Sequence, residues 1–138
     1  MILQTEGRVA LIERKRAGQC YYLFPGGGVE EFESPEDAAV REALEELGVT
    51  VSIERMIATS NTDRRREYYF LAVIEGGVFG TGTGNELDSS QESQKGSYTP
   101  IWMDIARLTS HDVRPHSLAM FIADGGLESV SEIIDIRD

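Results

Sequence analysis

The residues best suited to chemistry in this sequence are three glutamates, Glu42, Glu45 and Glu46. In a helix, which turns about 100° per residue, these positions share one face, where like charges three or four residues apart repel each other. Mg²⁺ or Mn²⁺ binds carboxylate oxygens and shares them with substrate phosphates, so a cation would convert this repulsion into attraction. A run of glutamates is more often a solvated helix face. Because the three side chains converge and a glycine-rich turn precedes them, we interpret the face as a metal and phosphate site.

The segment that carries these glutamates has clear helix boundaries. Ser34 is a good N-cap residue, Pro35 suits the first helical position, and Gly48 suits the C-terminal stop. These signals predict a helix over residues 35–47.

The apolar residues of this helix form a stripe opposite the carboxylates, which we expect to contact the core. The stripe contains Val40, Ala43, Leu44 and Leu47. Ala38 and Ala39 fall on the carboxylate side, where small residues would let a ligand or another backbone segment come close.

Segments with strand character lie on both sides of the helix. The expected strands cover residues 1–3, 9–12, 21–24, 49–61, 67–75 and 98–105. A second helix is expected over 115–123, and residues 76–97, rich in Gly, Ser and Thr, are expected to form a long loop. This order predicts an α/β fold in which helices cover both faces of a sheet.

Composition limits the kind of protein and its partners. The 138 residues fit one domain, and the single cysteine, Cys20, excludes an internal disulfide. With 13 basic and 24 acidic residues the net charge is −11, so we do not expect nucleic acid as a partner, and an anionic substrate would need cations as intermediaries. No membrane span or signal peptide is visible, which favours a cytoplasmic location without membrane contact. The very short first strand leaves a sheet edge that a second subunit could complete, as in a homodimer.

The segment GGGVEEFESPEDAAVREALEELGV resembles the signature of the Nudix (MutT-like) hydrolases, G-x5-E-x7-R-E-U-x-E-E-x-G-U, where U is a bulky or aliphatic residue. The matching positions are Gly27, Glu33, Arg41, Glu42, Ala43, Glu45, Glu46, Gly48 and Val49. The resemblance implies a single Nudix domain over residues 1–138, with the signature at 27–49. It also implies an α/β/α sandwich in which a mixed β-sheet lies between helices.

The resemblance further implies roles for the matching residues. The implied metal ligands are Glu42, Glu45, Glu46 and the backbone carbonyl of Gly27. Glu45 and Glu46 are also the candidate catalytic residues. Glu33 and Arg41 would form an ion pair that holds the loop against the helix and supports the ligands.

Four residues outside the signature complete the candidate site. Glu92, in the long loop, is a candidate general base or additional ligand, because family members can take such an acid from a distant loop. Arg14, at the end of a strand, and Arg64 and Arg66, in a basic turn, are candidates for contacts with substrate phosphate or base.

The activity implied is hydrolysis of a diphosphate linkage in a nucleoside diphosphate joined to another moiety, by attack of water at phosphorus. Mg²⁺ or Mn²⁺ is the implied cofactor, and a small nucleotide-type molecule is the implied substrate. The alternative is a catalytically silent Nudix-fold module that binds a nucleotide as a sensor. Loss of catalysis usually removes signature glutamates, and all of them are present here.

Overall fold

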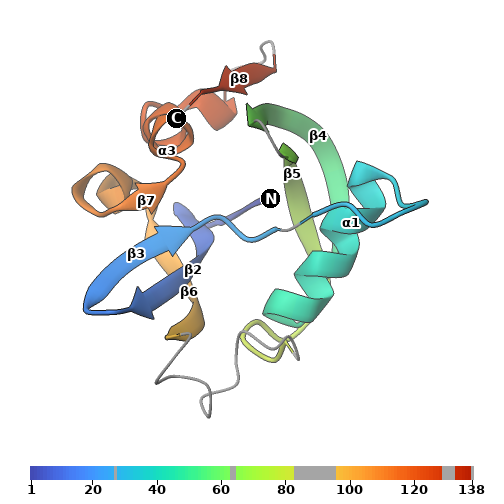
Figure 1. Ribbon diagram of the computed structural model, residues 1–138, viewed down its shortest axis with the longest axis horizontal. Helices are drawn as coiled ribbons and strands as arrows, with labels where there is room; N and C mark the ends of the chain where they lie inside the picture. The colour runs from blue at the N-terminus through green and yellow to red at the C-terminus, as the bar shows by residue number, and fades with distance from the viewer. Residues whose placement is uncertain (27, 63–64, 83–95, 129–132, 138) are drawn as a thin grey trace.

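The computed structural model describes residues 1–26, 28–62, 65–82, 96–128 and 133–137. The strands are β1 (Ile2–Thr5), β2 (Arg8–Arg16), β3 (Gln19–Leu23), β4 (Val49–Thr62), β5 (Arg65–Gly77), β6 (Ser97–Asp104), β7 (Val113–Arg114) and β8 (Ile134–Ile136). The helical segments are α1 (Pro35–Glu42), η1 (Ala43–Leu47), η4 (Ile105–Ser110), α3 (His116–Ala123) and η5 (Gly126–Glu128). Helices α1 and α3 lie on opposite sides of the strands (Figure 1). The α/β fold with a mixed sheet between helices is therefore confirmed.

The strand order explains why the sheet is mixed and why it divides. The order is β7-β3-β2-β1-β5-β4-β8, with β6 also paired to β2. The β1–β5, β3–β7 and β4–β8 pairs are parallel, and the other pairs are antiparallel. Because β6 pairs with β2 from Arg8 to Lys15, β1 and β3 must share the other edge of β2, one after the other. Beyond that edge, the β3–β7 part separates from the β1–β5–β4 part.

Strand β1 is short but lies inside the sheet. Ile2 pairs with Leu71 of β5, and Gln4 pairs with Val9 of β2. The idea that this strand leaves an open sheet edge is therefore wrong, because both of its sides are paired. A homodimer stays a prediction, but an open edge at β1 no longer supports it.

The other strands and the second helix follow the sequence prediction closely. β5 is central, as expected, and is two residues longer at each end than the predicted 67–75. α3 begins at His116, directly after the expected Pro115. The loop prediction over 76–97 is tested only at its ends, because residues 83–95, and Glu92 with them, lie outside the described residues.

The helix that carries the glutamates has the predicted boundaries, although its last turn is π-helical. α1 covers Pro35–Glu42 and η1 covers Ala43–Leu47. The Ser34 hydroxyl accepts a hydrogen bond from the Asp37 N–H at 3.0 Å. Gly48 ends the helix at a φ of 80°, a conformation that favours glycine.

The prediction of which helix face contacts the core is wrong in part. Val40 and Leu44 are 37% and 54% exposed. The buried helix residues are Ala38, Ala39, Ala43 and Leu47. Small side chains let the helix backbone lie close to the sheet. The alanine face therefore packs on the sheet, in place of the face with larger apolar side chains that the helical wheel predicted.

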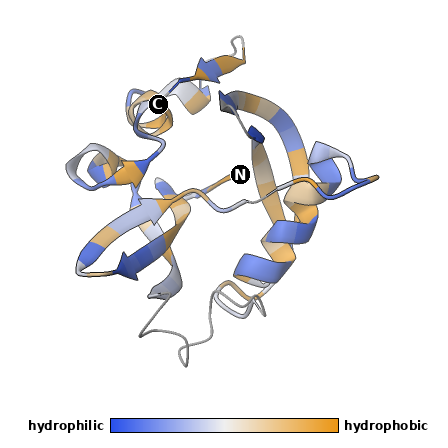
Figure 2. Ribbon diagram, viewed as in Figure 1, coloured by the Kyte–Doolittle hydropathy of each residue, from blue (hydrophilic) through white to orange (hydrophobic). Residues whose placement is uncertain are grey.

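Two hydrophobic clusters lie on opposite faces of the sheet. One contains the buried residues of α3, and the other contains those of η1. β2 contributes to both because its side chains alternate: Val9 and Leu11 join the α3 cluster, whereas Ala10 and Ile12 join the η1 cluster. Hydrophobic and hydrophilic residues also alternate along α1 and β4, as Figure 2 shows. Within the described part of the chain, no helix has the length and apolar character needed to span a membrane.

Candidate active site

Arg41 holds the loop before α1 against the helix. Its Nε donates to Glu33 Oε2 at 2.8 Å, and its Nη2 donates to Glu33 Oε1 and to the Gly28 carbonyl, each at 3.1 Å. The Arg41 hydrogen bonds, followed by a hydrogen bond from the Glu30 backbone N–H, hold the pKa of Glu33 below its usual range. The ion pair implied by the resemblance is present, and it links the loop to the helix.

The same guanidinium contacts two of the implied metal ligands. Its Nη1 donates to Glu42 Oε1 at 2.9 Å and to Glu45 Oε2 at 3.1 Å, and it lies 3.7 Å from Glu30 Oε1. With Glu33, one cation is in contact with four carboxylates. We call this group the Arg41 cluster. It has an excess of three negative charges, one against four, before Glu46 is counted.

Glu46 points to the glycine turn rather than to the arginine. Its Oε1 accepts a hydrogen bond from the Gly26 N–H at 3.3 Å. Glu45 and Glu46 both lie in the π-helical turn η1. Such turns inside helices are frequent at functional sites, because they change the direction in which neighbouring side chains point.

The donor set suits a divalent cation in its chemistry. Carboxylate oxygens are the ligands that Mg²⁺ and Mn²⁺ prefer, and the Arg41 cluster carries excess negative charge. Among the described residues, however, no three acidic, histidine or cysteine side chains are arranged to hold a metal ion. Glu42 and Glu45 are instead bonded to Arg41. A metal bound by these glutamates would have to replace those contacts. Gly27, the fourth implied ligand, lies outside the described residues.

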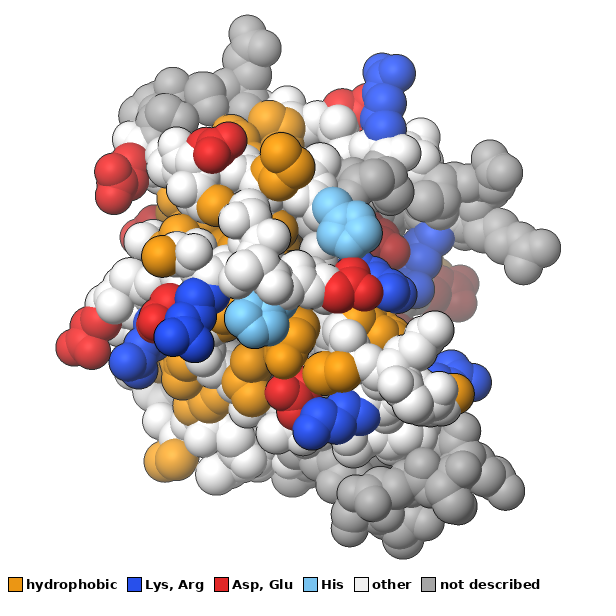
Figure 3. Space-filling model, turned by 90° about the vertical axis from the view of Figure 1, so that its left-hand side faces the viewer, with side chains coloured by type: hydrophobic (Ala, Val, Ile, Leu, Met, Phe, Trp, Pro, Cys, Tyr) orange, Lys and Arg blue, Asp and Glu red, His pale blue; other side chains and the backbone are white. Residues whose placement is uncertain are grey.

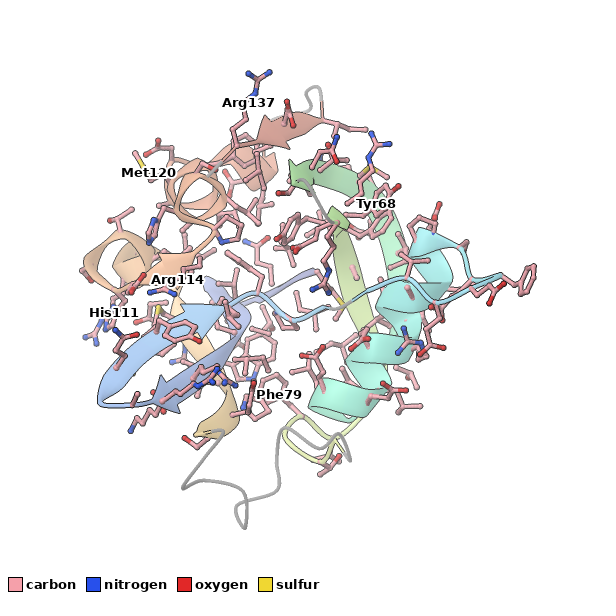
Figure 4. The ribbon with its side chains drawn as sticks, in the orientation of Figure 1. Tyr68, Phe79, His111, Arg114, Met120 and Arg137 are labelled. Atoms are coloured by element: carbon pink, nitrogen blue, oxygen red, sulfur yellow. The ribbon has the colours of Figure 1, made fainter. Side chains whose placement is uncertain are left out.

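A hollow of about 340 Å³ lies beside the glycine turn. Gly26 lines it and also binds Glu46, so the hollow adjoins the carboxylates. Residues of β3 and β7 line one side and residues of β4 and β5 line the other, where the two parts of the sheet separate. Arg114 and Tyr68 mark these two sides (Figure 4).

Met1 lines the hollow, and its nitrogen lies near the glycine turn. It donates a hydrogen bond to the Pro25 carbonyl at 2.7 Å. Burial lowers the pKa of this amino group to about 5, and the charges of Glu46 and Glu67 act in the opposite direction. The charges of Glu46, at the carboxylate helix, and of Glu67, in the hollow, thus both act on this amino group.

Arg14 lies on the face of β2 that points toward η1. It follows Ala10 and Ile12 at alternate positions, and these two residues pack with η1. Arg14 is buried, its Nε donates to the Tyr21 hydroxyl at 3.0 Å, and its guanidinium lies 3.8 Å from the centre of the Tyr98 ring. The structure therefore brings Arg14 to the same side of the sheet as the glutamates.

The basic turn contributes an arginine that the sequence reasoning missed. Arg65 lines the hollow, and its Nη2 lies 3.6 Å from the position that a Cβ on Gly28 would occupy. Arg66 lines a separate hollow with Arg137, which projects outward from β8 in Figure 4, and it is not brought together with the glutamates. Arg64 lies outside the described residues. Neighbouring residues of a strand point to opposite faces, and this alternation was the signal that could have separated Arg65 from Arg66.

A second group of charged residues lies at the opposite side of the hollow. Asp112 accepts hydrogen bonds from Arg114 Nη2 at 2.9 Å and Nε at 3.1 Å, and His116 Nε2 lies 2.9 Å from the same carboxylate. Hydrogen bonds from Arg114 and then His116 lower the pKa of Asp112 to about 2. Arg114 also lies over the Tyr21 ring, 4.1 Å from its centre. We call Asp112, Arg114 and His116 the Asp112 cluster. The two histidines of the chain are exposed among acidic and basic side chains on this side of the molecule (Figure 3).

The curated proteins that are similar to parts of this chain include a bacterial and a mouse protein. RNA pyrophosphohydrolase of Vibrio cholerae is 50% identical over 46 residues, which cover 33% of this chain and 27% of that protein. Diphosphoinositol polyphosphate phosphohydrolase 3-alpha of Mus musculus is 36% identical over 74 residues, which cover 51% of this chain and 44% of that protein. The similarity therefore spans less than half the length of either relative.

The fold has a close counterpart among solved structures, and a family model matches most of the sequence. The crystal structure of a NUDIX hydrolase from Nitrosomonas europaea aligns with a TM-score of 0.72 over 99% of this chain and 74% of that chain, at 19% identity, which is a likeness of fold. The family model described as NUDIX domain matches residues 1–122. This match, over most of the chain, agrees with the helix, loop and ion pair described above. The chain therefore belongs to the NUDIX domain family.

Proposed function

We propose that the protein is a pyrophosphohydrolase that depends on a divalent metal and cleaves the diphosphate linkage of a nucleoside diphosphate joined to another moiety. The observation that carries this proposal is the excess of carboxylates in the Arg41 cluster, next to a hollow large enough for a small molecule. Carboxylates held together in this way repel each other unless a cation compensates them. The names of the two relatives support the reaction type, since both denote hydrolysis of a pyrophosphate or diphosphate group.

In this proposal Glu42, Glu45 and Glu46 hold the metal, with the Gly27 carbonyl as an additional ligand. Bound Mg²⁺ or Mn²⁺ supplies neutralisation of the diphosphate oxygens and activation of water for attack at phosphorus. Glu45 and Glu46 would orient the attacking water, one of them would accept its proton, and Glu92 stays a further candidate for the proton acceptor.

The other predicted residues bind the substrate or position the carboxylates. Arg41 and Glu33 hold the loop and keep the carboxylates of η1 directed toward the substrate. Arg14 binds a phosphate oxygen from the opposite side of the site, as does Arg65, which lies next to the loop. Arg64 and Arg66 stay predictions as substrate contacts, and Arg66 has the weaker support because it lines a different hollow.

The partner and location predictions belong to the same proposal. The substrate is a small nucleotide-type molecule rather than a nucleic acid, because the chain carries a net charge of −11. A cytoplasmic location, a single domain over residues 1–138 and a homodimer are the corresponding proposals.

A panel of diphosphates tests the proposal. Purified protein is incubated with nucleotide sugars, dinucleoside polyphosphates, nucleoside triphosphates and ADP-ribose, with Mg²⁺, with Mn²⁺ and with a chelator. We expect cleavage of at least one diphosphate linkage only when the metal is present, with oxygen from labelled water in a phosphate product. Binding of a nucleotide without cleavage of any panel member would favour the silent sensor module instead.

A further inference from the structure

The hollow beside the glycine turn contains a carboxylate that the hydrolytic reaction does not use. Among the described residues that line it, Glu67 is the single acid. A carboxylate repels phosphate, so its presence in the binding hollow of a polyanionic substrate calls for another role. A contact with neutral N–H or O–H donors of the ligand fits this position.

The side chain of Glu67 is held in place and keeps acceptor capacity. Its Oε2 accepts a hydrogen bond from the Tyr69 hydroxyl at 2.8 Å, and its Oε1 lies 3.8 Å from Arg65 Nε. Ser60, which also lines the hollow, is its cross-strand neighbour. An ionised carboxylate has about four lone-pair positions, so it can accept two further hydrogen bonds.

The rest of the lining suits a planar ring. Phe24 and Tyr69 are buried, and Leu23, Tyr68 and Pro115 add further apolar surface. Aromatic and apolar side chains combined with a few polar groups are typical of sites that bind a base by stacking and by hydrogen bonds to its edge. The volume of about 340 Å³ is at the small end of the range for ligand pockets, which fits one base with its sugar.

The two arginines that line the hollow differ in their partners, since Arg114 is paired with Asp112 and Arg65 lies near Glu67 itself. Arg114 is bound at two atoms by Asp112 and lies over the Tyr21 ring. Arg65 lies beside Gly28, at the end of the hollow next to the carboxylate helix, where phosphate groups would be. Glu67 is therefore the charged group best placed to read the edge of a base.

We propose that this hollow binds the base of the substrate and that Glu67 selects guanine. Guanine presents two adjacent donors, N1–H and the 2-amino group, which match the two oxygens of a carboxylate. Adenine and cytosine instead present an acceptor nitrogen beside the exocyclic amine, and uracil presents one N–H between two carbonyls; each sets a lone pair against the carboxylate. The proposal rests on the proposed function in taking a nucleotide as substrate, and it deepens that function by naming the base.

Binding of monophosphates tests the proposal without metal or turnover. Calorimetric titration with GMP and with IMP, in a chelator, isolates the 2-amino group, because the two nucleotides differ only there. Wild-type protein is expected to bind GMP about tenfold more tightly than IMP, the discrimination of one good hydrogen-bonded contact to a base edge. AMP should bind no better than IMP.

The variant Glu67→Gln tests the residue. The glutamine carbonyl can still accept from Tyr69, so the fold should be kept, and thermal melting checks this. Its amide donors face the donors of guanine, so the preference for GMP should fall to within about twofold. Glu75→Gln is the matched control, since it removes one charge from an exposed position of the same strand and should keep the wild-type ratio.

Four results would overturn the assignment. The first three are equal affinity of the wild type for GMP and IMP, an unchanged ratio in folded Glu67→Gln, and no binding of any monophosphate. Weaker binding of dGMP than GMP in the wild type, with this difference lost in Glu67→Gln, would mean that Glu67 reads the ribose rather than the base. The outcome is separate from that of the proposed function: a guanine preference without any metal-dependent cleavage refutes only the hydrolase, and cleavage without a guanine preference refutes only this inference.

Discussion

The two charged clusters beside the hollow differ in their balance of charge. In the Asp112 cluster one carboxylate meets an arginine and a histidine, and the pKa of the carboxyl falls to about 2. In the Arg41 cluster one guanidinium meets four carboxylates. The first arrangement is complete as it stands, because each ion has a partner of opposite charge.

The Arg41 cluster has more carboxylates than its structural role requires. Glu33 alone gives Arg41 a two-point hydrogen-bonded partner, which would be enough to hold the loop. Glu42 and Glu45 add negative charge to the same cation without a structural need for it. An unbalanced cluster next to a hollow is therefore what the proposed cation site requires, whereas a balanced one fits a structural role.

The largest expected effect comes from removing the carboxylate of Glu46, which adds to the charge of the Arg41 cluster and binds the Gly26 N–H at the edge of the hollow. Glu46→Gln should lower metal-dependent turnover at least about a hundredfold, because it removes a proposed metal ligand. The midpoint of thermal unfolding should not fall, since one repelling charge is lost. Steady-state rates and melting curves check both. Glu36→Gln, at an exposed position of the same helix, is the control. A wild-type rate in Glu46→Gln would mean that the two clusters do not differ in function.

Removing the cation at the centre of the Arg41 cluster should have a smaller, mixed effect. Arg41→Ala leaves its carboxylates uncompensated and frees the loop, so the free energy of unfolding should fall by about 1–2 kcal/mol in a chelator, and turnover should fall as well. Mg²⁺ should restore part of the stability by binding to the carboxylates. Urea denaturation with and without Mg²⁺ measures this.

Arg8→Ala is the matched control for that experiment. Arg8 forms an exposed ion pair with Asp104 at 3.1 Å, and such pairs contribute about 0–1 kcal/mol. Its loss should change stability little and should be insensitive to Mg²⁺. A fully stable, inactive Arg41→Ala protein would contradict the supporting role of Arg41.

The smallest expected effect is on the pH dependence of stability. The folded-state pKa values of Glu33 and Asp112 are both lowered by arginine partners, so each ion pair adds stability above the ordinary carboxyl pKa. That stability should be lost as pH falls, for Asp112 between about pH 4 and about pH 2. Asp112→Asn and Glu33→Gln should each flatten the acid limb of the stability curve. Urea midpoints along a pH series measure this, and a limb unchanged in both variants would mean that neither pair stabilises the fold.

The sequence predicted the carboxylate helix well because local chemistry determines it. Ser34, Pro35 and Gly48 set its ends through hydrogen bonds and backbone preferences that act within a few residues. The ion pair between Arg41 and Glu33 was predictable only through resemblance to a known family, since it joins a loop to a helix.

The features that the sequence did not predict depend on tertiary packing. The helix contacts the sheet through alanines, and Leu44 stays exposed, because the space available between helix and sheet decided the face. The hollow and Glu67 were missed because they arise where β3 separates from β5, and strand order cannot be read from local patterns. Arg64 and Arg66 were predicted as substrate contacts and Arg65 was not, because the register of β5 was unknown.

Binding of Mn²⁺ to the wild type and to Glu46→Gln, measured by calorimetry or by the electron spin resonance of the ion, is the most direct test of the central claim. We predict that the wild type binds Mn²⁺ and that its dissociation constant rises at least about tenfold in the variant. Equal affinity in both proteins, or no Mn²⁺ binding by the wild type, would contradict the claim that the excess carboxylates of this helix form a metal site.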